Sequence, residues 1–205
     1  MLYIIMEGDD MIGYPNGKTA SRSLNPQTVK QSAGGRGMSL ENDLNKTNDY
    51  YLQLDKAVIH KKPTPIQIVQ VDYPKRSAAK ITEAYFKVPS TTDYNGVYRG
   101  KAIDFEAKET RSKTAFPFSH IHLHQIEHLE RVLRQGAIAF VIVRFIAFDE
   151  TYFVEAEKMI HQYRLAERKS LPYSWFVQEG ILIPYSLTPP VHYLRVIDEL
   201  YFKEK

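Results

Sequence analysis

Apolar and polar positions alternate along Ala102–Lys108, and this alternation predicts a β-strand with two different faces. One face is apolar and the other charged: Ile103, Phe105 and Ala107 on the first, Asp104, Glu106 and Lys108 on the second. Such a strand packs its apolar face on a core and presents two carboxylates and an ammonium group together on the other side.

The strand is predicted to be the second arm of a β-hairpin. Arg99–Gly100 lies between residues 93–98 and 101–109 and has the length of a two-residue hairpin loop. In that register Asp93 faces Glu106 and Thr91 faces Lys108, with facing Cβ atoms about 5 Å apart. Asn95–Gly96 offers an alternative turn or a bulge, and a shift of one residue would reverse the whole face.

The remaining pattern predicts a mixed α/β core. A helix should begin after the N-cap Ser39 and run to about residue 53, with Glu41 in its first turn. Further elements follow from apolar periodicity: strands at 58–60, 137–148, 151–153 and 181–185, and helices at 120–133, 156–168 and 191–202. We therefore expect one domain over residues 38–205.

Two segments depart from that pattern. Residues 1–37 are expected to form a flexible N-terminal arm, because 11–37 are rich in small polar residues and carry four basic residues and no acidic one. Lys61–Lys87 carries prolines near its start, a strand-like run, a turn at Tyr73–Arg76 and then a short helix or a return strand. Its six basic and two acidic residues favour a protruding stalk of about 61–87 over an ordinary surface insertion.

Composition narrows the function. The chain has no cysteine, which excludes disulfides, thiolate-bound zinc and thiol catalysis and fits a reducing, cytoplasmic setting. A signal peptide is not expected, since acidic residues follow a six-residue apolar start, and Met11 offers an alternative start. No run approaches the length of a membrane span. Basic segments on a nearly neutral body indicate a polyanionic partner.

The charged face of the predicted hairpin holds the candidate catalytic residues. Asp93 and Glu106 are hard oxygen ligands suited to Mg²⁺, which accepts one or two carboxylates together with water and phosphate oxygens. Thr91 could add a hydroxyl, and Lys108 places a cation beside the metal, an arrangement suited to phosphodiester hydrolysis. Asp104 lies on the same face and is a rival ligand.

Four histidines and one glutamine form a second group. His120, His124 and His128 would share one line of a helix, and with His122 they permit a zinc site, although the Glu that follows the first His in the zinc-protease motif is missing. A polar helix face is the preferred interpretation. Gln125 lies beside the apolar stripe and could reach inward to ligate a metal or orient a water.

Several motifs together resemble the bacterial RecU Holliday junction resolvases. The motifs are Tyr14–Lys18, Arg36–Met38, His60–Pro65, Val71–Ser77, Thr92–Gly96 and Ile103–Thr110. The resemblance runs from about Met11 to the C-terminus. It implies a restriction-endonuclease-like fold, a mixed sheet flanked by helices, with a protruding stalk, in a homodimer.

The resemblance also implies roles for individual residues. Thr91, Asp93, Glu106 and Gln125 would bind Mg²⁺, with Mn²⁺ as a substitute, and Lys108 would stabilise the transition state. It thus favours Asp93 over Asp104 as the ligand. The expected activity is resolution of four-way DNA junctions by symmetric paired nicks in recombination and repair. Six basic residues are expected to contact DNA: Arg36, Lys61, Lys62, Lys75, Arg76 and Lys80.

By resemblance the dimer would work with the RecA recombinase and branch-migration proteins, in the cytoplasm near the nucleoid. The alternatives are another repair or restriction nuclease of the same superfamily and a non-catalytic, junction-binding architectural protein. A zinc hydrolase built on the histidines is a weaker one.

Overall fold

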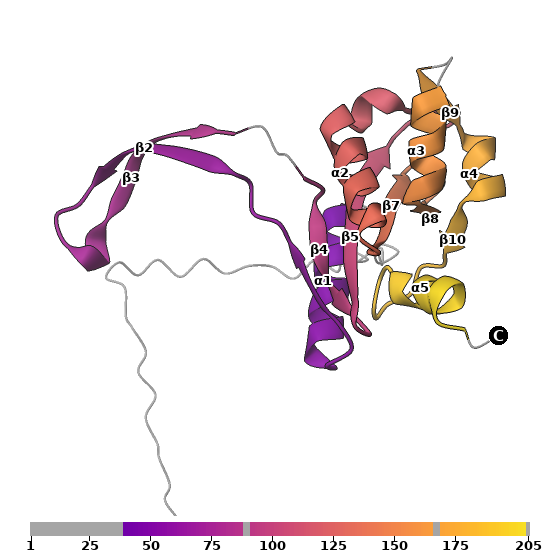
Figure 1. Cartoon of the computed structure of the whole chain (residues 1–205), viewed down its shortest axis with the longest axis horizontal. Helices are drawn as coiled ribbons and strands as arrows, with labels where there is room; N and C mark the ends of the chain where they lie inside the picture. Colours follow the sequence, from indigo (N-terminus) through magenta and orange to yellow (C-terminus); the bar gives the residue numbers. More distant parts are fainter. Residues whose placement is uncertain (1–38, 88–90, 166–168, 204–205) are drawn as a thin grey trace, which may run out of the picture. The chain divides into compact units, whose positions relative to one another are not determined.

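The computed structural model describes residues 39–87, 91–165 and 169–203. The expected arm at residues 1–37, including Arg36, lies outside them. The mixed α/β core predicted from the sequence is confirmed: a six-stranded sheet has the order β1-β4-β5-β7-β8-β10 and helices on both faces (Figure 1). Among the described strands of this sheet, only the β5–β7 pair is parallel.

The sheet is built from strands of very different length. The bounds are β1 (Val58–Lys61), β4 (Tyr94–Tyr98), β5 (Lys101–Thr110), β7 (Ile138–Phe145), β8 (Glu150–Glu155) and β10 (Ile181–Ile183). All eight residues of β7 are buried, as expected for a central strand covered on both faces. Its side chains alternate between two cores: Phe140 and Ile142 in one, Val141 and Val143 in the other.

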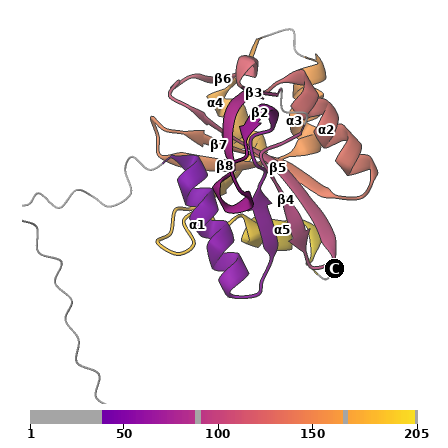
Figure 2. The same ribbon diagram turned by 90° about the vertical axis from the view of Figure 1, so that its left-hand side faces the viewer.

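Within the described residues, five α-helices cover the two faces. Residues of α1 (Leu40–Gln53) and α5 (Tyr193–Tyr201) share one core with Phe105 and Phe140. Residues of α2 (Leu123–Arg134), α3 (Ala156–Leu165) and α4 (Tyr173–Glu179) share the other. Figure 2 shows α1 and α2 on different sides of the β4–β5 hairpin. The charged face of β5 therefore looks toward α2, and its apolar face toward α1 and α5.

The predicted register of the β4–β5 hairpin is confirmed. Tyr94 pairs with Phe105 and Tyr98 with Lys101, so Arg99–Gly100 is the loop. Both loop residues have positive φ, 49° and 75°, as a type I′ turn requires. Asn95–Gly96 lies inside β4 instead, where a Cβ on Gly96 would come 2.0 Å from the Val58 carbonyl oxygen of β1. That glycine serves the close approach of two strands, not a turn.

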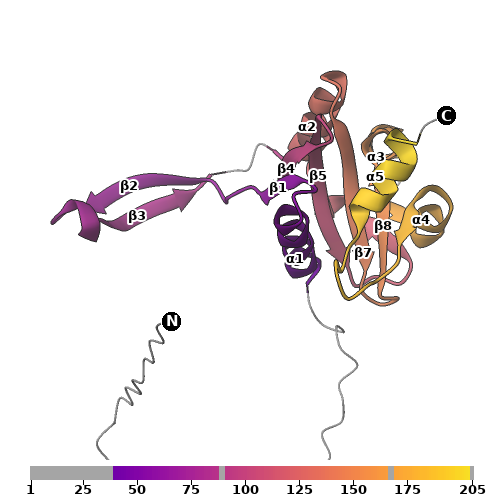
Figure 3. The same cartoon turned by 90° about the horizontal axis from the view of Figure 1, so that it is seen from below.

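The segment expected as a stalk contains a separate two-stranded sheet. Strands β2 (Ile66–Asp72) and β3 (Lys80–Phe86) pair antiparallel, and a 3₁₀ turn, η1 (Arg76–Ala78), lies in their connection (Figure 3). Of the two alternatives at 77–86, the return strand is the one formed. Every residue of both strands is exposed, so neither face packs on the remaining described residues.

Several elements depart from the sequence prediction. The single helix expected from His120 begins only at Leu123, because His120 ends a 3₁₀ turn, η2 (Phe118–His120), and His122 is the N-cap. The pattern also missed α4 and the small sheet of β6 (Ala115–Pro117) and β9 (Ser170–Pro172). Within the described segments, no helix combines the length and the apolar character needed to cross a bilayer.

Candidate active site

Glu106 is the buried centre of the site. It lies on the α2-facing side of β5, its exposed fraction is 0%, and three groups surround its carboxylate. The Asp93 amide donates to Oε2 at 3.2 Å, the Gln125 side-chain amide donates to Oε1 at 2.5 Å, and the Lys108 ammonium lies 2.5 Å from Oε1. A carboxylate with these donors is held in one orientation.

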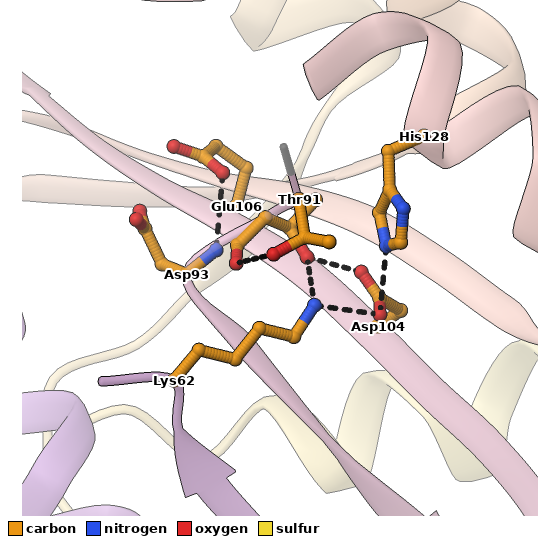
Figure 4. Close-up of polar contacts among 7 residues, drawn as sticks. Lys62, Thr91, Asp93, Asp104, Glu106 and His128 are labelled. Carbon is orange, nitrogen blue, oxygen red and sulfur yellow. Dashed lines mark hydrogen bonds and ion pairs between the residues drawn. The ribbon is translucent and has the colours of Figure 1, made fainter. Parts of the chain in front are cut away.

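Asp93 meets Glu106 at the start of β4, as the hairpin register predicted. Its carboxylate accepts a hydrogen bond from the Ala107 amide at 3.2 Å, which ties it to β5 directly beside Glu106. Figure 4 shows both carboxylates on the same side of the strand, with Thr91 nearby. Thr91 donates to the Thr92 carbonyl at 3.4 Å, a long bond that leaves its hydroxyl weakly held.

The proximity of the two acids changes the protonation of Glu106. Burial and then the Asp93 charge raise the pKa of Glu106 to about 8, while the Lys108 ammonium opposes this rise. Two carboxylates in one desolvated place repel one another, and a cation relieves that repulsion. The donor set is thus two carboxylates and a hydroxyl, which fits a hard divalent ion such as Mg²⁺.

Gln125 reaches inward, as its position beside the apolar stripe suggested. Its side-chain oxygen accepts from the His122 amide at 2.8 Å and closes the first turn of α2, while its nitrogen donates to Glu106. In this arrangement Gln125 orients Glu106. A role as a direct metal ligand requires the oxygen to leave the helix cap.

A cavity of about 570 Å³ opens beside these residues. It is lined by the start of α1, the end of β1 and the segment after it, the start of β4 and the end of β5. Thr91, Asp93 and Lys108 line it, and Glu106 lies buried behind them. Glu41 also lines it, paired with Lys61 at 2.5 Å. Glu41 is therefore in a position to add a further oxygen ligand.

Asp104, the rival ligand, pairs with other side chains and not with the Asp93–Glu106 pair. Its carboxylate contacts the Lys62 ammonium at 3.0 Å, the His128 imidazole at 3.2 Å and the Thr92 hydroxyl. Figure 4 shows Asp104 turned toward Lys62 and His128, away from the Asp93–Glu106 pair. Sequence reasoning missed this cluster because Lys62 and Asp104 are 42 residues apart.

The histidines do not gather. His122 and His124 stack at 5.5 Å between ring centroids, His128 contacts Asp104, and His120 packs edge-on against Phe116. Among the described residues, no three His, Cys, Asp or Glu side chains form a metal-binding group. The shared helix line that permitted a zinc site is wrong, because His120 precedes α2.

The basic residues expected to contact DNA have different surroundings. Lys75 and Lys80 are exposed in the β2–β3 hairpin and its connection. Lys61 and Lys62 line the cavity, and each pairs with a carboxylate, Glu41 and Asp104 respectively. The Lys61 side chain is 40% exposed and the Lys62 side chain is 19% exposed. Lys62 is therefore mostly buried, with its ammonium group paired to Asp104.

The raised pKa of Glu106 gives a stability prediction. The group is protonated in the folded, metal-free protein up to about pH 8 but ionises near pH 4.5 when unfolded, so stability falls as the pH rises between these values. Glu106→Gln removes the titration. In EDTA, we expect the gap in melting temperature, mutant minus wild type, to increase from pH 5 to pH 8 by at least roughly 2–4 °C.

Thermal denaturation at both pH values measures this gap. Glu130→Gln is the control, because it removes a carboxylate paired with Arg164 on the surface of α2 and α3. A gap for Glu106→Gln that is constant or narrows toward pH 8 contradicts the assignment of a desolvated, repelled carboxylate.

Similarity of sequence points to one family. The family model described as RecU, Recombination protein U, matches residues 35–199. Proteins named Holliday junction resolvase RecU from Bacillus thuringiensis (strain Al Hakam) and Bacillus cereus (strain AH820) are each 51% identical over 197 residues, 93% of this chain and 98% of theirs. One from Bacillus anthracis matches equally.

A solved structure of another Holliday junction resolvase aligns more weakly. Archaeoglobus fulgidus Hjc, a Holliday junction resolvase from an archaeal hyperthermophile, shares 13% identity and a TM-score of 0.37 over 67% of this chain and 93% of its own. That likeness is too weak to indicate a shared function. The family model and the 51% identical relatives are sufficient: the chain belongs to the RecU family.

Proposed function

We propose that this protein is a Mg²⁺-dependent endonuclease that recognises four-way DNA junctions and resolves them by paired nicks. The 51% identical relatives named Holliday junction resolvase support the substrate. The observation that carries the chemistry is the placement of Lys108 at 2.5 Å from Glu106, with Asp93 hydrogen-bonded to the same strand segment. Acid, acid and lysine on one strand face beside an open cavity suit phosphodiester hydrolysis.

Each residue of the site has its own proposed role in hydrolysis. Asp93 and Glu106 would hold the metal, with Thr91 and Glu41 as further oxygens at the cavity wall. When bound, Mg²⁺ supplies Lewis-acid polarisation of the phosphate and lowers the pKa of a bound water. Gln125 fixes the Glu106 carboxylate through its amide. In the reaction, the water oxygen loses a proton to solvent and forms a bond to phosphorus, while the bond from phosphorus to the leaving sugar oxygen breaks and that oxygen takes up a proton from solvent.

Lys108 is proposed to stabilise the transition state. Its ammonium touches Glu106 and its side chain lines the cavity, so it can meet charge that develops on the phosphoryl oxygens. We expect Lys108→Met to lower the cleavage rate about 10²–10³-fold, the range seen for loss of one such electrostatic contact. Junction affinity should change by little more than the loss of one cation implies.

Single-turnover cleavage of a labelled four-way junction in saturating Mg²⁺ measures this loss. EDTA should stop the wild-type reaction, and renewed Mg²⁺ should restore it. Lys158→Met is the control, since Lys158 forms an exposed ion pair with Glu179 and is not among the residues that line the cavity. Cleavage by Lys108→Met at the wild-type rate would remove Lys108 from the mechanism.

Two sites are needed for paired nicks, so we propose a C2 dimer. The β2–β3 hairpin supports an assembly of this kind. Its exposed apolar side chains include Ile68, Val71, Ile81 and Phe86, and a two-stranded hairpin open on both faces is marginal by itself. A second copy or the junction would cover it, and Lys75 and Lys80 would face the phosphates. By resemblance, the dimer would act beside recombination proteins such as RecA.

A further inference from the structure

Asp104 occupies a position that the proposed mechanism does not use. It is on the same face of β5 as Glu106, two residues earlier, and its side chain is only 9% exposed. A buried carboxylate is costly unless it is paired and hydrogen-bonded. Here it has three partners, Lys62, Thr92 and His128, which come from three separate segments.

Two of these partners mark the roots of the β2–β3 hairpin. Lys62 directly follows β1, where the chain leaves the six-stranded sheet, and Thr92 lies just before β4, where it returns. Lys62 donates to Asp104 at 3.0 Å and to the Thr92 hydroxyl at 2.9 Å, and Thr92 donates to Asp104. One carboxylate on β5 thus joins both roots. We name Asp104, Lys62, Thr92 and His128 the root clasp.

The root clasp is continuous with the cleavage site. The Lys62 amide donates to the Asp93 carbonyl at 2.8 Å, and Asp93 follows Thr92 directly. On the other side, α2 contacts Asp104 through His128 and Glu106 through Gln125, one turn earlier. The hairpin roots are therefore linked to Asp93 by a backbone hydrogen bond, and Asp104 and Glu106 are both held by side chains of α2.

We propose that Asp104 is a positioning residue whose carboxylate fixes both roots of the hairpin to the catalytic strand. DNA held by the hairpin is thereby presented to Asp93 and Glu106 at one fixed phosphate. The inference rests on the proposed nuclease function for its DNA readout, but the clasp itself is a property of the free protein. It gives Lys62 a specificity role through Asp104 and Thr92 in place of a simple phosphate contact.

The test compares Asp104→Asn with wild type in two ways. Amide hydrogen exchange of the free protein should show faster exchange at Lys62, while the Lys87 amide, which closes the hairpin on the Pro65 carbonyl at 3.0 Å, keeps its rate. On a labelled four-way junction, the nick should spread from one phosphate to several neighbours. The cleavage rate should fall about tenfold or more with the KM little changed, because no phosphate-binding cation is removed.

Further variants separate positioning from general loosening. Lys62→Met combined with Asp104→Asn should add little to the single change if both act through one clasp. Thr92→Val, which keeps the side-chain shape, should reproduce the spread of nicks if Asp104→Asn folds poorly. Asp43→Asn is the matched control, because it breaks an equally buried ion pair, Asp43–Arg144 at 2.7 Å, that does not touch the roots.

The outcomes are distinct. Wild-type exchange at Lys62 together with an unchanged nick position in Asp104→Asn and Thr92→Val overturns the clasp, and so does an equal spread of nicks in Asp43→Asn. If the wild-type protein cuts no junction, the proposed function fails, and the exchange at Lys62 still decides whether Asp104 holds the hairpin roots.

Discussion

Replacing Asp93 or Glu106 by alanine should abolish junction cleavage, with a loss of about 10³-fold or more, and leave junction binding intact. The two carboxylates are the proposed oxygen ligands of the metal, and the cavity wall and the strand behind it bring them together. Loss of either removes metal affinity and a large electrostatic contribution to the transition state. Binding should persist, because removing an acid near phosphates does not weaken the protein's electrostatic attraction to DNA.

Gel shifts in EDTA and single-turnover cleavage in Mg²⁺ separate the two effects. Asp93→Asn and Glu106→Gln keep the side-chain shapes and guard against collapse of the buried site. Asp198→Asn is the control. This acid on α5 binds Tyr98 and Arg99 at the loop of the β4–β5 hairpin and does not line the cavity. Its loss should spare cleavage. Joint loss of binding and cleavage in the conservative variants would indicate misfolding and not a metal site.

Removing the β2–β3 hairpin should lower the ratio of junction affinity to duplex affinity by at least about tenfold, which corresponds to ~1.4 kcal/mol. The hairpin carries exposed lysines and apolar side chains that pack on nothing else in the described structure. A four-way junction has an open centre that a duplex lacks, and a projection of this kind suits it. Metal binding at Asp93 and Glu106 should survive, since Glu106 lies on β5 and Asp93 directly precedes β4, both outside the deleted residues.

The strand bounds decide how to make this deletion. Removing only residues 63–80 would leave most of β3 without β2 as its partner. The Pro65 carbonyl and the Lys87 amide are 3.0 Å apart, so an Asn-Gly turn in place of residues 66–86 can join them without strain. Competition gel shifts with junction and duplex of the same sequence give the ratio. An unchanged ratio would place junction recognition elsewhere.

Local pattern predicted the part of the site that lies within one hairpin. Side-chain alternation placed Glu106 and Lys108 on one face of β5, and the loop length set the register that brings Asp93 beside Glu106. The Asn95–Gly96 ambiguity could not be resolved from the sequence, because the close contact of Gly96 with Val58 belongs to the pairing of β1 with β4.

Long-range pairing is where the sequence was insufficient. In the sequence Asp104 could be read as a metal ligand, because its ion-pair partner Lys62 comes from a distant segment and the pairing could not be foreseen. Lys62 resembled a DNA contact for the same reason. The line of His120, His124 and His128 was wrong because the capping of α2 by His122 and Gln125 starts the helix later than the apolar periodicity suggested. Three-residue strands such as β6 and β9 are too short to show a period.

The most direct test of the account is cleavage of a labelled synthetic four-way junction beside a linear duplex of the same sequence. Wild type and Asp93→Ala would be compared in Mg²⁺ and in EDTA, with the nicks mapped on all four strands. We expect paired, symmetric nicks in the junction alone, lost in EDTA and in the mutant. Equal cutting of the duplex, or tight junction binding without any nick, would contradict it.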